Sequence, residues 1–178
     1  MSAARVRIGG ARIGLDDVFA RMPFRFGSVT IEAAVAATLA LELTVDGRKI
    51  TGYASEILAY KWFDKRPEKS AAQNVADLLS ILQDAVSRAE TFPEMRGAAE
   101  GQGHNALMAG YGTSMVERAM IDGVGRALGL TVHQMLKGGT TGLAPGDVFP
   151  ELADMDPGAA LGSPPRDRVA VRHTVGML

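Results

Sequence analysis

The segment Thr30-Ile-Glu-Ala-Ala-Val-Ala-Ala-Thr-Leu-Ala-Leu-Glu-Leu-Thr-Val45 decides the fold, because apolar and polar residues alternate along most of it. Every odd position from Ile31 to Val45 is apolar, whereas glutamate and threonine occupy several even positions. Successive side chains of a β-strand point to opposite faces of a sheet, so the pattern predicts a strand with one buried face. A strand of this length would extend about 53 Å at roughly 3.3 Å per residue, so we expect a bend, a bulge or a shorter strand.

The neighbouring segments predict two further strands. Asp46-Gly47 separates the long strand from Lys49–Glu56, and an Asp-Gly pair predicts a tight hairpin because glycine adopts the positive φ that the turn requires. Arg5–Ile8 alternates in the same way and predicts a shorter strand near the N-terminus. Phe19–Ser28 contains a proline and a glycine and is predicted to be a loop. The expected sheet is therefore a three-stranded antiparallel meander.

Beyond the sheet the apolar spacing becomes helical. Ser70-Ala-Ala-Gln73 has the pattern of a capping box and predicts a helix that runs to about Ala89. Ser114 with Glu117 predicts a second capped helix, which ends at Gly129. The positions expected to face the core are Ala71, Val75, Leu78, Leu79, Leu82 and Val86 in the first helix and Met115, Ala119, Met120, Val124, Ala127 and Leu128 in the second. The predicted fold class is α+β, with a helical layer after the meander.

The C-terminal part has a different composition. Five of the eight prolines lie between Leu143 and Pro165, so we expect residues 140–167 to form an extended linker. Arg168–Val175 alternates and predicts a strand within a final segment, residues 168–178, that has no pairing strand beside it in the sequence. Residues 1–139 are predicted to be the folded domain.

Composition excludes several classes of protein. The hydrophobic fraction of 47% and charged fraction of 22% are those of a globular chain, and the net charge of −1 gives no general attraction to nucleic acid or anionic membranes. The sequence has no cysteine, no signal-peptide pattern and no apolar run of the roughly 20 residues that span a bilayer. We therefore expect a cytoplasmic protein that binds neither nucleic acid nor membrane.

No motif assigns a catalytic or metal-binding residue. Gly101-Gln-Gly-His-Asn-Ala106 fits a dinucleotide-binding pattern, but no buried strand precedes it, so a helix-entry loop is the better interpretation. His104, His133 and His173 lie far apart in the sequence and have no metal-ligand spacing. Asp122 is expected to anchor its helix to a neighbouring segment, and Gly123 to allow close helix packing.

Two segments near the sheet resemble the substrate-facing loops of the enolase superfamily, specifically the mandelate racemase and muconate-lactonising enzymes. Pro23-Phe-Arg-Phe-Gly27 looks like the mobile loop that closes over substrate between the first two strands of their N-terminal capping domain. Gly52-Tyr-Ala-Ser-Glu56 looks like the end of the third strand, which leads into a second substrate-facing loop. The resemblance implies that six residues of these loops contact substrate: Phe24, Arg25, Phe26, Tyr60, Lys61 and Trp62.

A third match lies in the second predicted helix and covers the end of that domain. Glu117-Arg-Ala-Met-Ile-Asp122, followed by Ala127–Gly138, is similar to the family pattern Glu-x-Ala-x-x-Asp and Ala-Leu-Gly-x-Pro-Val-x-x-Leu-Leu-Gly-Gly. Thr131 replaces the usual proline, and Lys137 replaces the first glycine of the ending. The resemblance spans about residues 3–139, and 168–178 would begin the barrel that carries catalysis in the family.

The resemblance implies an Mg²⁺-dependent lyase, isomerase or epimerase acting on a carboxylate substrate. In the family, a barrel domain supplies the Mg²⁺ ligands and the proton-transferring residues. Such a barrel needs roughly 200 residues or more, and far fewer follow Gly138 here. We therefore expect this chain to act as the capping domain, to be inactive alone and to hold no metal. The alternative is a non-catalytic binding or assembly module, including a homo-oligomer, that pairs through its C-terminal strand.

Overall fold

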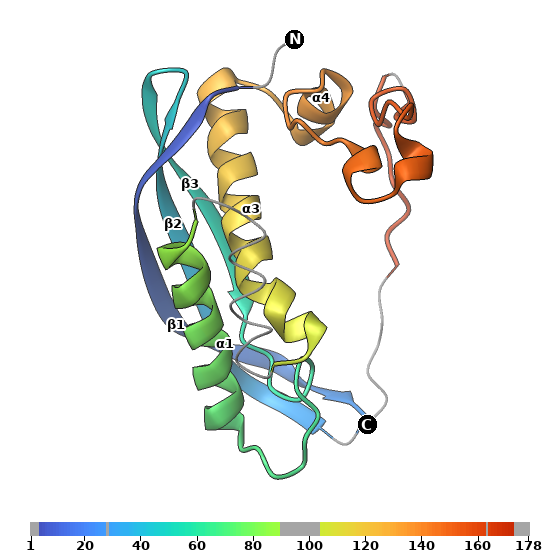
Figure 1. Ribbon diagram of the computed structural model, residues 1–178. Helices are drawn as coiled ribbons and strands as arrows, with labels where there is room; N and C mark the ends of the chain where they lie inside the picture. Colours follow the sequence, from blue (N-terminus) through green and yellow to red (C-terminus); the bar gives the residue numbers. More distant parts are fainter. Residues whose placement is uncertain (1–3, 28, 90–103, 163, 173–178) are drawn as a thin grey trace.

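The computed structural model describes residues 4–27, 29–89, 104–162 and 164–172. Three antiparallel strands form one sheet in the order β1-β2-β3, and two long helices lie side by side against one face of it (Figure 1). The strands are β1 (Val6–Phe26), β2 (Val29–Val45) and β3 (Arg48–Ile57). The α+β class and the meander predicted from the sequence are confirmed.

β2 is the central strand and carries the buried face that its alternation predicts. Ala37, Leu39, Leu41, Leu43 and Val45 are all buried. The odd-numbered residues of β2 that precede Ala37 in the sequence are more exposed, because β3 pairs only with residues 36–45 of β2. Residues 29–35 therefore form a two-stranded ribbon with β1, which extends past the end of β3 (Figure 1).

β1 is much longer than the predicted strand Arg5–Ile8. The predicted loop Phe19–Ser28 is wrong over most of its length, because β1 continues to Phe26 and the chain reverses at Gly27, where φ is 54°. The register shifts between Phe19 and Phe24, around Pro23. A proline has no N–H to donate, but β1 is an edge strand and tolerates it at an irregularity.

The turn between β2 and β3 is the one that the sequence predicts. Asp46 and Gly47 both have positive φ, 47° and 87°, as the tight hairpin turn requires. Asp46 also fixes the start of β1, since its backbone N–H donates to Arg5 O at 3.0 Å and its carboxylate accepts from Arg5 N at 3.1 Å. The turn therefore aligns all three strands at this end of the sheet.

The first helix, α1 (Ala71–Ser87), begins at the predicted capping box. Ser70 accepts a hydrogen bond from Gln73 N at 3.2 Å, and Gln73 accepts one from Ser70 N at 2.8 Å. Leu78 and Leu82 face the core as predicted, but Ala71 is exposed, whereas Val75, Leu79 and Val86 are half-buried. The residues that the helix buries are Asn74, Leu78, Ile81, Leu82 and Ala85.

The second long helix, α3 (Ala106–Leu128), begins nine residues before the predicted start, since its N-cap is Asn105 rather than Ser114. Asn105 is its N-cap and accepts from Met108 N at 3.0 Å, whereas Ser114 lies inside the helix and donates to Tyr111 O. The predicted second capping box is therefore wrong. The predicted C-cap is confirmed, because Gly129 adopts the left-handed conformation with φ of 68°.

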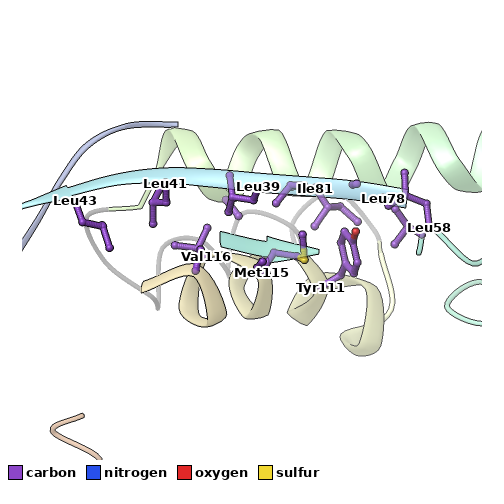
Figure 2. Packing of buried hydrophobic residues seen from close by; sticks show 14 of the residues in the cluster. Leu39, Leu41, Leu43, Leu58, Leu78, Ile81, Tyr111, Met115 and Val116 are labelled. Carbon is purple, nitrogen blue, oxygen red and sulfur yellow. The ribbon is translucent and has the colours of Figure 1, made fainter. Parts of the chain in front are cut away.

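α3 buries most of the apolar residues expected on its inner side. Met115, Ala119, Val124 and Ala127 are buried, whereas Met120 is half-buried and Leu128 is 38% exposed. Figure 2 shows part of the buried cluster, in which Met115 and Val116 of α3 lie near labelled leucines of β2 and near Ile81 of α1.

α3 crosses β3 at two glycines. A Cβ on Gly52 would overlap the carbonyl oxygen of Ala119 and lie 2.8 Å from Gly123 N, and a Cβ on Gly123 would lie 3.3 Å from Gly52 Cα. Close by, Tyr53 N donates to Asp122 Oδ2 at 2.9 Å, so Asp122 anchors the helix to an edge strand as predicted. The predicted close packing at Gly123 is also confirmed.

The C-terminal region contains more local structure than the expected linker. α4 (Val132–Lys137) precedes two short 3₁₀ turns, η1 (Pro145–Asp147) and η2 (Pro150–Leu152), each of which starts at a proline. The turns form because proline fixes the φ that the first position of a helical turn needs. His133 Nε2 and Lys137 Nζ hold this region through the carbonyls of Gly162 and Leu161.

The described part of the predicted C-terminal strand, residues 168–172, has no regular secondary structure. Val169 and Val171 are 79% and 88% exposed, because no described strand pairs with this segment. Residues 173–175 of the predicted strand lie outside the described residues.

Candidate functional site

A hollow of about 570 Å³ lies where the β1–β2 ribbon extends past β3. Its walls come from all three strands and from the segment that follows β3. The residues that line it are Val18, Phe19, Ala20, Phe24, Ile31, Ala33, Ala34, Glu56, Ile57, Ala59, Trp62 and Phe63. We call it the ribbon cavity. Its volume lies within the range of roughly 300–1,000 Å³ that is typical of small-molecule sites.

The ribbon cavity joins the two segments that the sequence singles out as substrate-facing. Phe24 comes from β1 beyond the register shift, and Trp62 comes from the turn after β3. Phe24 is 48% exposed and Trp62 is 56% exposed, so both rings remain accessible to a ligand. A hydrogen bond of 3.4 Å from Tyr60 Oη to Thr30 O holds the second segment against β2. The structure therefore brings together Phe24, Tyr60 and Trp62.

Arg25 is not among the residues that line the ribbon cavity, although its neighbour Phe24 is. The contact with substrate that the resemblance implies for Arg25 therefore has no support at this cavity. The backbone of Phe26 pairs with Val29 at the end of the ribbon, and the Phe26 side chain lies outside the described part of the chain.

Lys61 has a structural role that the sequence does not predict. Its Nζ donates to the carbonyl oxygens of Arg66 and Lys69, and its backbone N–H donates to Asn74 Oδ1 at 3.0 Å. Lys61 has a positive φ of 60°, which turns the chain sharply between β3 and α1. These contacts hold the neighbouring Trp62 in place and leave the Lys61 ammonium engaged with the protein.

A buried carboxylate fixes the other end of the same segment. Asp64 is 2% exposed, and its oxygens accept from Arg66 Nε at 3.0 Å and Arg66 Nη2 at 2.6 Å. The hydrogen bonds from the Arg66 side chain hold the pKa of Asp64 well below its usual range, although burial opposes the shift. Lys69 lies 3.6 Å from the same carboxylate and also pairs with Asp77. This charge cluster links the segment between β3 and α1 to Asp77 of α1.

Two residues that line the ribbon cavity, Glu56 and Phe63, contact side chains of α3. Glu56 Oε2 lies 3.2 Å from Arg118 Nη1, which links the end of β3 to α3. The ring of Phe63, a cavity residue, packs edge-to-face on Tyr111 with a centroid distance of 5.3 Å. Burial raises the pKa of Tyr111 to about 12, and the charge of Glu56 adds to this effect. The Tyr111 hydroxyl has no hydrogen-bond partner among the described residues.

The described residues do not fit the Mg²⁺ that the family resemblance implies. They contain no group of three or more His, Asp or Glu side chains arranged to hold a metal ion. His104 precedes α3 and His133 lies on α4, whereas His173 is outside the described residues. In the part of the chain that the structure describes, no helix has both the length and the apolarity needed to cross a membrane.

Comparison with known proteins gives no family assignment. No protein-family model matches this chain, and no curated protein matches it with significance.

Proposed function

We propose that this chain is the substrate-capping domain of an enolase-superfamily-like enzyme, a lyase, isomerase or epimerase acting on a carboxylate substrate. The observation that carries the proposal is the ribbon cavity, in which Phe24 and Trp62, from the two motifs that resemble the capping loops, line one accessible hollow. The order of a three-stranded meander followed by two helices supports it.

In this proposal the chain contributes binding and exclusion of water rather than proton transfer. Eleven of the residues that line the ribbon cavity are aliphatic or aromatic, and Glu56 is already paired with Arg118. Enclosing a reacting group in such a lining removes water and strengthens electrostatic interactions in the site. The metal and the groups that move protons would belong to a barrel domain, because the described residues offer no ligand set.

The test is exchange of the proton next to the substrate carboxylate in D₂O, followed by NMR with Mg²⁺ and a panel of carboxylic acids. Two polypeptides are compared, the 178-residue chain and the chain extended by the coding sequence that follows the Leu178 codon. We expect exchange by the extended polypeptide and none by the 178-residue chain. Exchange by the shorter chain would contradict the proposal, as would a following sequence without acidic residues at successive strand ends.

A substitution in the extended polypeptide then tests the capping role. Trp62→Ala should raise KM at least fivefold with a smaller effect on kcat, because Trp62 binds substrate without taking part in the chemistry. Trp62 is 56% exposed, so the domain should remain folded. An unchanged KM in a folded variant would argue against capping by this cavity.

A second candidate function is assembly through the C-terminal segment. The exposure of Val169 and Val171 favours it, because an alternating segment without a partner is suited to pairing with another strand. Light scattering after size-exclusion chromatography would then detect an oligomer that Val171→Asp reduces to a monomer. A monomer at all concentrations would exclude this function.

A further inference from the structure

We infer that the ribbon cavity receives the apolar tail of a carboxylic acid substrate, such as a branched-alkyl or cycloalkyl group, while the carboxylate points away from the cap. The inference rests on the proposed function, since it names the substrate class that this capping domain would select. The cavity should therefore prefer such acids to polyhydroxy acids of similar size.

The lining of the ribbon cavity is the first reason. Phe19, Phe24, Ile57 and Trp62 present large apolar surfaces to it, each at least 44% exposed. Glu56 and the Trp62 indole are the lining side chains that carry a polar atom. A polyhydroxy acid would have to give up its hydrogen bonds to water without regaining them from these walls, whereas an apolar tail gains from leaving water.

The charged groups at the cavity are the second reason. Glu56 is the charged residue among those that line it, and its carboxylate, which pairs with Arg118, has no hydrogen-bond donor to offer a substrate carboxylate. Arg118 is also occupied, because its Nη1 pairs with Glu56 at 3.2 Å and its Nη2 lies 2.9 Å from Met115 Sδ, so its guanidinium is not available to bind a substrate carboxylate. Arg25 of the neighbouring ribbon is not among the lining residues, and Lys61 Nζ donates to backbone carbonyls. The acidic end of a bound substrate therefore faces out of the cap.

The chain offers a direct reporter, because Trp62 is its single tryptophan. Tryptophan emission is recorded while the 178-residue chain is titrated with cyclohexylacetate and, separately, with D-gluconate. Both are monocarboxylates that do not absorb at the excitation wavelength. We expect a saturable shift of the emission to shorter wavelength with cyclohexylacetate, with a Kd at least tenfold lower than that for gluconate. Cyclohexylmethanol, which lacks the charge, should bind with a Kd within threefold of that for cyclohexylacetate.

Matched variants locate the binding. Phe24→Ala should weaken binding of cyclohexylacetate at least fivefold, whereas Phe149→Ala should leave it unchanged, because Phe149 is 53% exposed but lies outside the cavity lining. Saturation-transfer NMR on the unmodified chain gives a readout that needs no variant. The ring protons of the ligand should receive more saturation than the protons next to its carboxylate.

Three outcomes would overturn the inference: no binding of cyclohexylacetate, equal or tighter binding of gluconate, or strongest saturation next to the carboxylate. None of these outcomes contradicts the capping function, which the proton-exchange experiment tests on its own. Conversely, selective binding of the apolar acid by a chain whose extension lacks exchange activity would contradict the capping proposal and support the ligand class.

Discussion

At the scale of single residues, two glycines set the distance between α3 and the sheet, because neither has a side chain to hold the backbones apart. Gly52 and Gly123 face each other, and the backbone of Ala119 occupies the space where a Cβ on Gly52 would lie. The obstacle is backbone, which cannot rotate away as a flexible side chain would. Asp122 and Tyr53 N add a hydrogen bond beside the crossing, so the helix has one position on β3.

Gly52→Ala should therefore destabilise the protein by about 3 kcal/mol, because the added methyl group forces the helix and the strand apart. Gly110→Ala is the matched control, since a Cβ at Gly110 meets nothing within 4 Å and alanine favours the helix by up to about 1 kcal/mol. Urea unfolding followed by circular dichroism measures both. If Gly52→Ala lowers the free energy of unfolding by no more than Gly110→Ala raises it, the helix and the strand are not tightly packed at the crossing.

Asp64 is the residue whose ionisation should govern acid stability most clearly. Hydrogen bonds from the Arg66 side chain lower its pKa in the folded state below the ordinary value of 3.8. The folded state therefore binds this proton less readily than the unfolded state, and the resulting stability is fully present above about pH 4. It is lost as the pH falls below 3.8 and through the lower pKa of the folded protein.

Asp64→Asn should cost about 2 kcal/mol at pH 7, because it removes the charged acceptor of Arg66 and Lys69. The difference in unfolding free energy between the variant and the unmodified chain should shrink as the pH falls from 5 to 2. Urea titrations at five pH values in this range provide the measurement. A difference that stays constant with pH would mean that the carboxylate of Asp64 does not carry the effect.

At the scale of elements, burial explains which parts of the fold the sequence predicts. β2 and the Asp46-Gly47 turn were predictable because one face of the strand is buried along residues 37–45 and the turn needs positive φ. Most of β1 was not, since it is an exposed edge strand interrupted by glycines, charged residues and Pro23. Its extent comes from pairing with β2 rather than from its own pattern.

The start of α3 was missed for a related reason. Ser114 and Glu117 have capping-box spacing, but Asn105 is the true cap and has no glutamate or glutamine three residues later. Gly110 and Gly112 lower the helical propensity of the first turns. Gly112 nevertheless suits the helix, because it allows close approach to Ile81 and Ala85 of α1.

Substitution of the two candidate caps separates these interpretations. Asn105→Ala should destabilise the protein by about 1 kcal/mol, since it removes the hydrogen bonds to Met108 N and Phe63 O. Ser114→Ala should change stability by no more than about 0.5 kcal/mol, because loss of a weak bond to Tyr111 O is offset by better helix propensity. Thermal and urea unfolding of both variants measure these changes in stability. A larger loss of stability in Ser114→Ala than in Asn105→Ala would show that Ser114 caps the helix.

The candidate site was predictable in part. Phe24 and Trp62 belong to motifs that the sequence singles out, and the structure places both at the ribbon cavity. The ion pair of Glu56 with Arg118 was not predictable, because its partners are 62 positions apart and only the packing of α3 on β3 brings them together. The structural role of Lys61 depends in the same way on carbonyl groups whose positions no local pattern reveals.

At the scale of the whole molecule, stability is concentrated in the sheet and the two long helices. The buried residues of the described hydrophobic core lie within residues 37–85 and 108–135, and no described residue after Met135 belongs to it. Residues 164–172 are exposed, and the hydrogen bonds that hold the C-terminal region to α4 end at Gly162. The folded unit is therefore complete without the last described segment.

Removal of residues 164–178 should shift Tm by less than about 2 °C, because a protein of this size loses roughly 2–4 °C per kcal/mol and the described part of this segment, residues 164–172, is exposed. Differential scanning calorimetry of the full and shortened chains measures this. A decrease of more than about 5 °C would show that the final segment packs on the domain or on another copy of it.

The change in burial along β2 has a consequence for how the strand opens. Residues 37–45 lie between two strands and beneath the helices, whereas residues 29–35 have one partner strand and more exposed side chains. Backbone amides exchange with solvent through local openings whose free energy follows such packing. One continuous strand should therefore show two deuterium uptake rates, with slow uptake in the covered half and fast uptake in the half that lines the cavity. The end of the domain that would meet a ligand can then open without unfolding the rest.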